Sequence, residues 1–196
     1  MSSAHALPAP PLQRPRVLMV GTAFMAAAST MVILGMLGIY LAQRADFLSA
    51  GSVWLPTGAS IPLQQPNTMM ITLIMSVITM QWAVNAISRN DRGHAYMALG
   101  LTLVLGAATI VMTSYLFTLM ELDISSGLQG VLIYSITGAH LLMLIVAMIF
   151  VALMAFRALG GQFAARQHDG ISAAALYWDA MVAVYSILWI SIYITK

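Results

Sequence analysis

The chain has 196 residues, of which 61% are hydrophobic and only 7% are charged, whereas roughly a quarter of the residues in a soluble domain are charged. This composition excludes an ordinary soluble domain and predicts an integral membrane protein. The absence of cysteine excludes disulfides, thiolate-bound iron–sulfur clusters and cysteine-attached haem, and the net charge of +2 is too weak to indicate nucleic-acid binding.

Apolar runs between the few charges predict the membrane spans. A helix needs about 20 apolar residues to cross a hydrocarbon core about 30 Å thick, because it rises about 1.5 Å per residue. The chain begins with a proline-rich tail over residues 1–16, which we expect in the cytoplasm. Residues 17–196 are predicted to form an all-α bundle of five transmembrane helices, at about 17–43, 67–88, 95–120, 129–156 and 172–195. Prolines between residues 56 and 66 mark a long loop before the second helix.

The arginines predict the orientation of the bundle. Cytoplasmic segments of membrane proteins carry an excess of Lys and Arg. Only Arg44 and Lys196 fall on one side of the predicted membrane, together with the acidic pair Glu121 and Asp123. We therefore expect the N-terminus in the cytoplasm and the C-terminus outside. The predicted cytoplasmic set is Arg14, Arg16, Arg89, Arg92, Arg157 and Arg166.

Two ionisable side chains fall inside the predicted spans, His140 in the fourth helix and Asp179 in the fifth. Such groups are costly in a bilayer and mark a function or a buried partner. One histidine at membrane depth cannot supply two axial ligands to a haem, so we assign no catalytic, metal-binding or cofactor-binding residue to this chain. We expect His140 to form a hydrogen bond between helices or to contact a lipid headgroup; metal ligation and a proton relay are less favoured. A direct contact with Asp179 requires the two helices to be offset.

Other polar side chains share faces with these groups. Gln81, Asn85 and Ser88 lie at i, i+4 and i+7 of the second helix, so they face either a packed neighbour or a hydrophilic path. Asp179 lies about two turns into the last helix, where it is either buried or reached by water and headgroups. The predicted lipid or interhelical polar contacts are His140, Thr137, Asp179, Gln81 and Asn85.

Short motifs from about residue 17 to the end resemble one known family. The fourth-helix motif, Thr-Gly-x-His, is the most specific of them. The chain resembles subunit III of haem-copper terminal oxidases in its five-helix bacterial form. The motifs that carry the resemblance are Tyr40 to Ala45, Ser76 to Gln81, Arg89 to Gly93, Thr137 to His140, and Tyr177-Trp178 with the later Trp189 and Tyr193.

The chain departs from this family at its buried acidic and imidazole groups. Met143 stands where the family has a second histidine in the fourth helix, and Asp179 replaces the histidine that follows Tyr-Trp. A lipid-binding or proton-entry function of those groups is therefore lost or rebuilt here. The remaining departures are Val182 for an aspartate, and Ser29 and Ser114 at or beside glutamate positions.

The resemblance implies a non-catalytic accessory subunit of a respiratory terminal oxidase, of the cytochrome c or quinol type, in a bacterial inner membrane. Such a subunit packs beside the haem-copper subunit I and subunit II, which hold the haem and copper. It binds phospholipid between its helices and supports assembly, proton uptake and stability during turnover. The alternatives are a small carrier or channel that uses Gln81, Asn85 and Asp179, and an accessory subunit of another redox complex such as nitric-oxide reductase.

Overall fold

The computed structural model describes residues 17–55, 60–122, 124, 127–161 and 169–195. Over these residues the chain is helical, without strands, and five helices are long and apolar enough to cross a membrane, which confirms the predicted fold class. They are α1 (Val17–Ser49), α2 (Gln64–Ser88), α3 (Arg92–Leu119), α4 (Leu128–Leu159) and α5 (Asp169–Leu188), which a π-helix, η2 (Trp189–Ile194), extends. The predicted tail, residues 1–16, lies outside the described residues.

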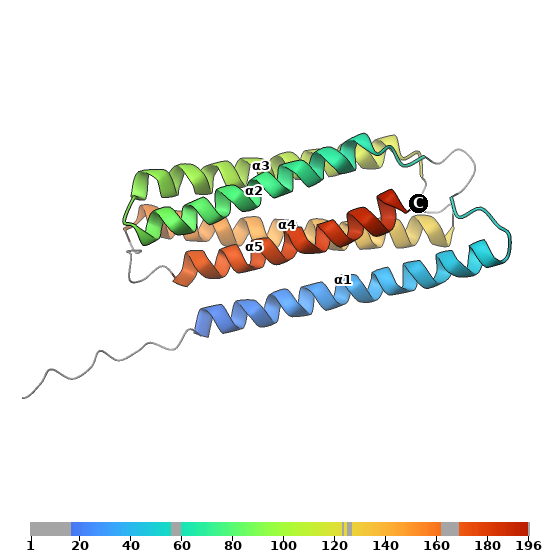
Figure 1. Ribbon diagram of the computed structural model, residues 1–196, viewed down its shortest axis with the longest axis horizontal. Helices are drawn as coiled ribbons and strands as arrows, with labels where there is room; N and C mark the ends of the chain where they lie inside the picture. Colours follow the sequence, from blue (N-terminus) through green and yellow to red (C-terminus); the bar gives the residue numbers. More distant parts are fainter. Residues whose placement is uncertain (1–16, 56–59, 123, 125–126, 162–168, 196) are drawn as a thin grey trace, which may run out of the picture.

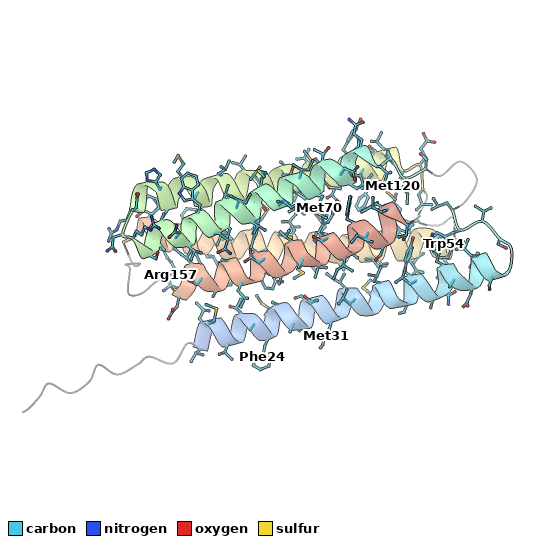
Figure 2. The ribbon with its side chains drawn as sticks, in the orientation of Figure 1. Phe24, Met31, Trp54, Met70, Met120 and Arg157 are labelled. Atoms are coloured by element: carbon cyan, nitrogen blue, oxygen red, sulfur yellow. The ribbon has the colours of Figure 1, made fainter. Side chains whose placement is uncertain are left out.

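The five helices run up and down along one common axis (Figure 1). The first turn of α1, the α2–α3 turn and the last turn of α4 lie at one end of the bundle, and η2 ends at the other. α5 packs against α1, α2 and α4, whereas α1 packs chiefly against α4 and α5. Helix α1 therefore forms one side of the bundle, and Phe24 and Met31 point outward from it (Figure 2). These two side chains are 72% and 74% exposed.

Each helix extends beyond its predicted range at one end or both, and α1 and α2 show why. α1 continues beyond Gln43 to Ser49, because a charge limits a membrane span without breaking a helix. The guanidinium of Arg44 in this extension donates to the carbonyl oxygen of Thr195, next to the end of η2. α2 begins at Gln64 rather than near Asn67, since Pro66 is tolerated in a first turn where backbone N–H groups lack helical acceptors.

Trp54 anchors the segment after α1 to the helix itself. Its side chain is buried, and its indole N–H donates to the Tyr40 hydroxyl at 3.2 Å. The rings of Tyr40 and Phe47 meet the Trp54 ring edge to face, at centroid distances of 5.4 and 5.3 Å. Such edge-to-face pairs add to the stabilisation that comes from burial alone. The chain therefore folds back over the end of α1 before it turns toward α2.

Gly106 leaves room on α3 for the Trp178 ring of α5 and the Met148 side chain of α4. A Cβ atom at this position would lie 2.9 Å from Cη2 of Trp178 and 3.0 Å from Sδ of Met148. The Trp178 side chain is fully buried and has no room to move away. Small residues at helix interfaces bring backbones together in membranes, where packing rather than the hydrophobic effect drives helix association. Gly106 thus provides the space that the Trp178 ring occupies.

Candidate functional site

Four side-chain hydrogen bonds with oxygen acceptors join α2 to α5 and η2, and we call this set the α2–α5 seam. A longer contact from Ser186 Oγ to the Met70 sulfur, at 3.7 Å, joins the same two helices. Partners along α2 and α5 run in roughly opposite chain order, as expected of neighbouring antiparallel helices. A buried polar group in a membrane needs a partner within the protein, since lipid offers none. The donors and acceptors are Tyr185 Oη to the Pro66 carbonyl (3.1 Å), Trp189 Nε1 to Asn67 Oδ1 (2.9 Å), Trp178 Nε1 to Ser76 Oγ (2.9 Å) and Gln81 Nε2 to Asp179 Oδ2 (2.7 Å).

Gln81 and Asp179 form a solvent- or lipid-exposed hydrogen bond of this seam. Both residues were predicted as polar contacts, and the structure brings them together from α2 and α5. Gln81 is exposed and Asp179 is half-buried. Asp179 Oδ2 accepts the amide hydrogen of Gln81, while Oδ1 is buried without a hydrogen-bond partner among the described residues. The amide thus satisfies one of the two carboxyl oxygens and holds the carboxyl group against α2.

Asn85 lies one turn beyond Gln81 but belongs to a different surface. It is exposed and lines a pocket at the α2–α3 turn, together with Trp82, Arg89 and His94. Asp179 does not line this pocket. No hydrogen bond joins the Asn85 side chain to the Gln81–Asp179 pair within the described part of the chain, although all three were predicted as possible members of one hydrophilic path.

His140 and Thr137 lie on the buried face of α4. Nε2 of His140 is 3.3 Å from the Met181 carbonyl oxygen of α5, and its ring centroid is 5.2 Å from that of Tyr185. Thr137 donates to the Ile133 carbonyl of its own helix at 2.7 Å. His140 therefore forms a contact between α4 and α5, and among the described residues it has no hydrogen bond to Asp179. His140 and Thr137 line a cavity of about 10 Å³, together with Met69, Thr113, Tyr185, Leu188 and Tyr193.

Among the residues that the structure describes, no three His, Asp or Glu side chains gather as ligands of a metal ion would. His94 instead pairs with Asp91 at the α2–α3 turn, where Nδ1 and Oδ2 are 2.7 Å apart. The backbone N–H of His94 also donates to Asp91 Oδ1 at 3.2 Å, which caps α3. This backbone hydrogen bond, with the His94 side chain, lowers the pKa of the Asp91 carboxyl below its usual value.

An apolar groove runs between α1 and α4. Ser29 and Tyr177 meet at its floor, where their hydroxyl oxygens are 3.2 Å apart. Ser29 and Met143, two positions that depart from the resembled family, both line this groove. The acidic and imidazole groups expected at these positions are thus missing from one shared surface. The lining residues are Ser29, Val32, Ile33, Ala139, Leu142, Met143, Val146 and Tyr177.

Most of the α2–α5 seam was missed at the level of sequence. Trp178, Trp189 and Ser76 were identified only as parts of motifs, although an indole N–H within a membrane span requires an acceptor. Asn67 was identified only as the start of a helix. The signal that was available is the pairing of tryptophans on the last helix with small polar side chains on an antiparallel neighbour.

Comparisons with known proteins place the chain among relatives of one kind. The profile of the family described as Cytochrome c oxidase subunit III matches residues 15–196. Proteins called Cytochrome c oxidase subunit 3 are similar to the chain: that of Neotragus moschatus is 32% identical over 156 residues, that of Mus musculus 31% over 145, and that of Chondrus crispus 29% over 151. These alignments cover 79%, 73% and 76% of this chain. The chain spans 60%, 56% and 56% of the lengths of these relatives.

Proposed function

The chain belongs to the cytochrome c oxidase subunit III family, and on this premise we propose that it is a non-catalytic accessory subunit of a respiratory terminal oxidase. The observation that carries the proposal is the family match, which extends over residues 15–196. The five membrane-spanning helices fit a multi-pass subunit of such a complex. We propose further that the complex lies in a bacterial inner membrane, with the N-terminus of this chain in the cytoplasm. The arginine distribution supports this orientation, since Arg89, Arg92 and Arg157 belong to the end of the bundle where α1 begins.

The proposed partners are the haem-copper subunit I and subunit II, which would hold the haem and copper. The residues of this chain do not fit a haem bound within its own bundle. His140 is the one described histidine in the interior of a span, and its Nε2 faces a backbone carbonyl of α5. His94 lies at the start of α3 and pairs with Asp91. The exposed apolar side of α1, which includes Phe24 and Met31, offers a surface for a partner helix or lipid.

We propose that the groove between α1 and α4 binds phospholipid acyl chains. Its lining is apolar apart from Ser29 and Tyr177, whose hydroxyl groups contact each other. The groove therefore suits a hydrocarbon chain better than a charged group. Support of proton uptake and of stability during turnover would then depend on packing and lipid rather than on a buried acid in this groove.

Gentle solubilisation of the membrane tests this function. The tagged full chain should co-purify with a haem-bearing subunit and with phospholipid, and the purified complex should show Soret absorbance. Recovery of a monodisperse chain without any haem protein, with solute flux after reconstitution into liposomes, would contradict the proposal and favour a carrier. Recovery with a nitric-oxide reductase would assign the same accessory role to a different redox complex.

A further inference from the structure

A polar pocket opens at the α2–α3 turn, at the end of the bundle where α1 begins. It is lined by Trp82, Asn85, Ala86, Arg89, Asp91 and His94. The Trp82 and His94 rings lie against each other at a centroid distance of 5.8 Å. Tryptophan is enriched at membrane–water interfaces, where its ring meets the lipid headgroups. The pocket therefore lies at the depth where a headgroup would be found.

The hydrogen-bond donors of this pocket are open to a ligand. Within the described part of the chain, the side chains of Arg89 and Asn85 form no hydrogen bond or ion pair. Both are exposed. Both oxygens of the Asp91 carboxylate are already engaged by His94, through its backbone N–H and its Nδ1. The acid is thus occupied within the chain, while the guanidinium and the amide remain free to bind an acceptor.

The charge of the turn favours an anion. Arg89 and Arg92 outnumber the single acid, Asp91, so the turn has a net positive charge before any contribution from His94. Arginine binds phosphate through a planar fork of N–H donors, which gives both charge and geometric complementarity. Basic residues next to a membrane each contribute about 1 kcal/mol of attraction to anionic lipid.

An apolar stripe leads away from the pocket along α2 and α3. Its members lie at helical spacing from Trp82 on α2 and from His94 on α3, so each set shares one face of its helix. From Trp82 to Ile71 the stripe is about 16 Å long at 1.5 Å per residue, close to the thickness of one leaflet of a core about 30 Å thick. The exposed members are Ile71, Met75 and Ile78 on α2, and Met97, Leu101 and Val104 on α3.

We propose that the α2–α3 turn binds an anionic phospholipid, with the phosphate on Arg89 and Asn85 and an acyl chain along this stripe. The free hydrogen-bond donors lie at the membrane–water interface, and the exposed apolar stripe is about as long as one leaflet is thick. These two features together fit an amphiphile of this kind. The site lies on α2 and α3, away from the groove between α1 and α4. It does not depend on the accessory role, because it rests on the residues of this turn alone.

Quenching of tryptophan fluorescence by brominated lipids tests the proposal. The full chain is reconstituted into vesicles of unlabelled phosphatidylcholine with a minor fraction of brominated phosphatidylglycerol or brominated phosphatidylcholine. The Trp82 signal is the difference between the wild-type chain and Trp82→Phe. We expect brominated phosphatidylglycerol to be preferred roughly fivefold, from about 1 kcal/mol per arginine. Equal quenching by the two lipids would overturn the proposal.

Arg92→Gln is the matched control for Arg89→Gln, because both remove one positive charge from the same turn and only Arg89 lines the pocket. Arg89→Gln should abolish the preference, and Arg92→Gln should retain most of it. Equal losses would show diffuse attraction to the membrane and would overturn the site. Asn85→Ala changes no charge and should weaken the preference for phosphatidylglycerol about twofold. This variant tests the site if Arg89→Gln does not fold. An unchanged preference in that variant would contradict the assignment of Asn85.

A second arm distinguishes a lipid from a free anion. Inorganic phosphate is added to the same vesicles, at matched ionic strength against a chloride control. The lipid assignment predicts that phosphate changes the Trp82 quenching no more than chloride does, because the acyl chain adds binding that free phosphate lacks. Displacement of the brominated lipid by phosphate beyond the chloride effect would assign the site to a free anion and overturn the proposal.

Discussion

Helices α5 and α1 lie side by side but are held in opposite ways. In their most apolar windows, 61% of the residues of α5 are buried inside the bundle, against 17% of those of α1. Together, α5 and η2 supply one partner to each hydrogen bond of the α2–α5 seam. Side-chain contacts of α1 with the rest of the bundle include the weaker pair of Ser29 and Tyr177.

The two least hydropathic spans, α5 and α2, are the two most buried. α5 is the least hydropathic of the five spans and yet the most buried, whereas α1 is among the more hydropathic and faces outward. In a membrane the polar helix must be enclosed by its neighbours, because lipid gives no hydrogen bonds to groups such as Trp178 and Asp179. The bundle is therefore built around its last helix, and its first helix is left with an outer face for lipid or a partner.

Trp178→Ala on α5 should have the largest effect on stability. It removes a fully buried ring and leaves the Ser76 hydroxyl without its donor. We expect a loss of about 3–5 kcal/mol in the free energy of unfolding, measured by denaturant titration in mixed micelles. Leu176→Ala, on the same helix at a side chain that is 37% exposed, should cost less than about 1 kcal/mol. Equal losses in the two variants would contradict a core centred on α5.

Gly106→Ala tests whether the Trp178 ring sets the spacing of α3 from α5. The new Cβ would lie 2.9 Å from a ring that has no room to move, so we expect destabilisation by about 1–2 kcal/mol. Gly100→Ala is the matched control, because a Cβ there meets nothing within 4 Å. That variant should be neutral or more stable by up to about 1 kcal/mol, since alanine favours a helix over glycine. The same sign for both variants would refute the close contact.

Asp179→Asn and Asp179→Leu test the hydrogen bond between Gln81 and Asp179 in the seam. Asparagine keeps an oxygen that can accept from Gln81, so the fold and its assembly with partners should be retained, with only a modest change in turnover. Leucine removes the acceptor and should cost about 0.6–1.7 kcal/mol, between the average and the maximum measured for hydrogen bonds between membrane helices. Unfolding titrations of both variants measure the difference. Loss of the whole assembly in Asp179→Asn would show instead that the carboxyl group itself is structural.

Ser29→Ala should have the smallest effect, because it removes one polar contact of α1 at 3.2 Å. We expect a cost of about 0.6 kcal/mol or less. Tyr177→Phe removes the same contact from the α5 side and should match it in the same titration. A cost as large as that of Trp178→Ala would mean that α1 is anchored as firmly as α5, which would break the contrast between them.

The sequence was sufficient to predict an all-helical chain with five membrane-length helices, because the length of an apolar run is set by membrane thickness. It also identified Gln81 and Asp179 as polar groups that require partners. It could not pair them, because pairing depends on the rotation of α2 and α5 about their axes, which packing around Trp178 and Gly106 determines.

The environment of His140 shows the same limit. Its position in the fourth span predicted an interhelical contact, but a periodicity argument cannot distinguish a neighbouring side chain from a backbone carbonyl. The structure pairs His140 with the carbonyl oxygen of Met181, two residues beyond Asp179. The end of α1 was underestimated for a related reason, since Arg44 contacts the distant Thr195 and the helix continues through it.

The most direct test is to separate the chain from the haem-bearing partner proposed for it and to record both absorbance and cooperative unfolding. The proposed accessory role predicts that the separated chain has no Soret band, and a fold built around α5 predicts that it still unfolds in one cooperative transition. A Soret band that stays with the chain would contradict the accessory role. Loss of helical structure on separation would contradict a bundle held together by its own last helix.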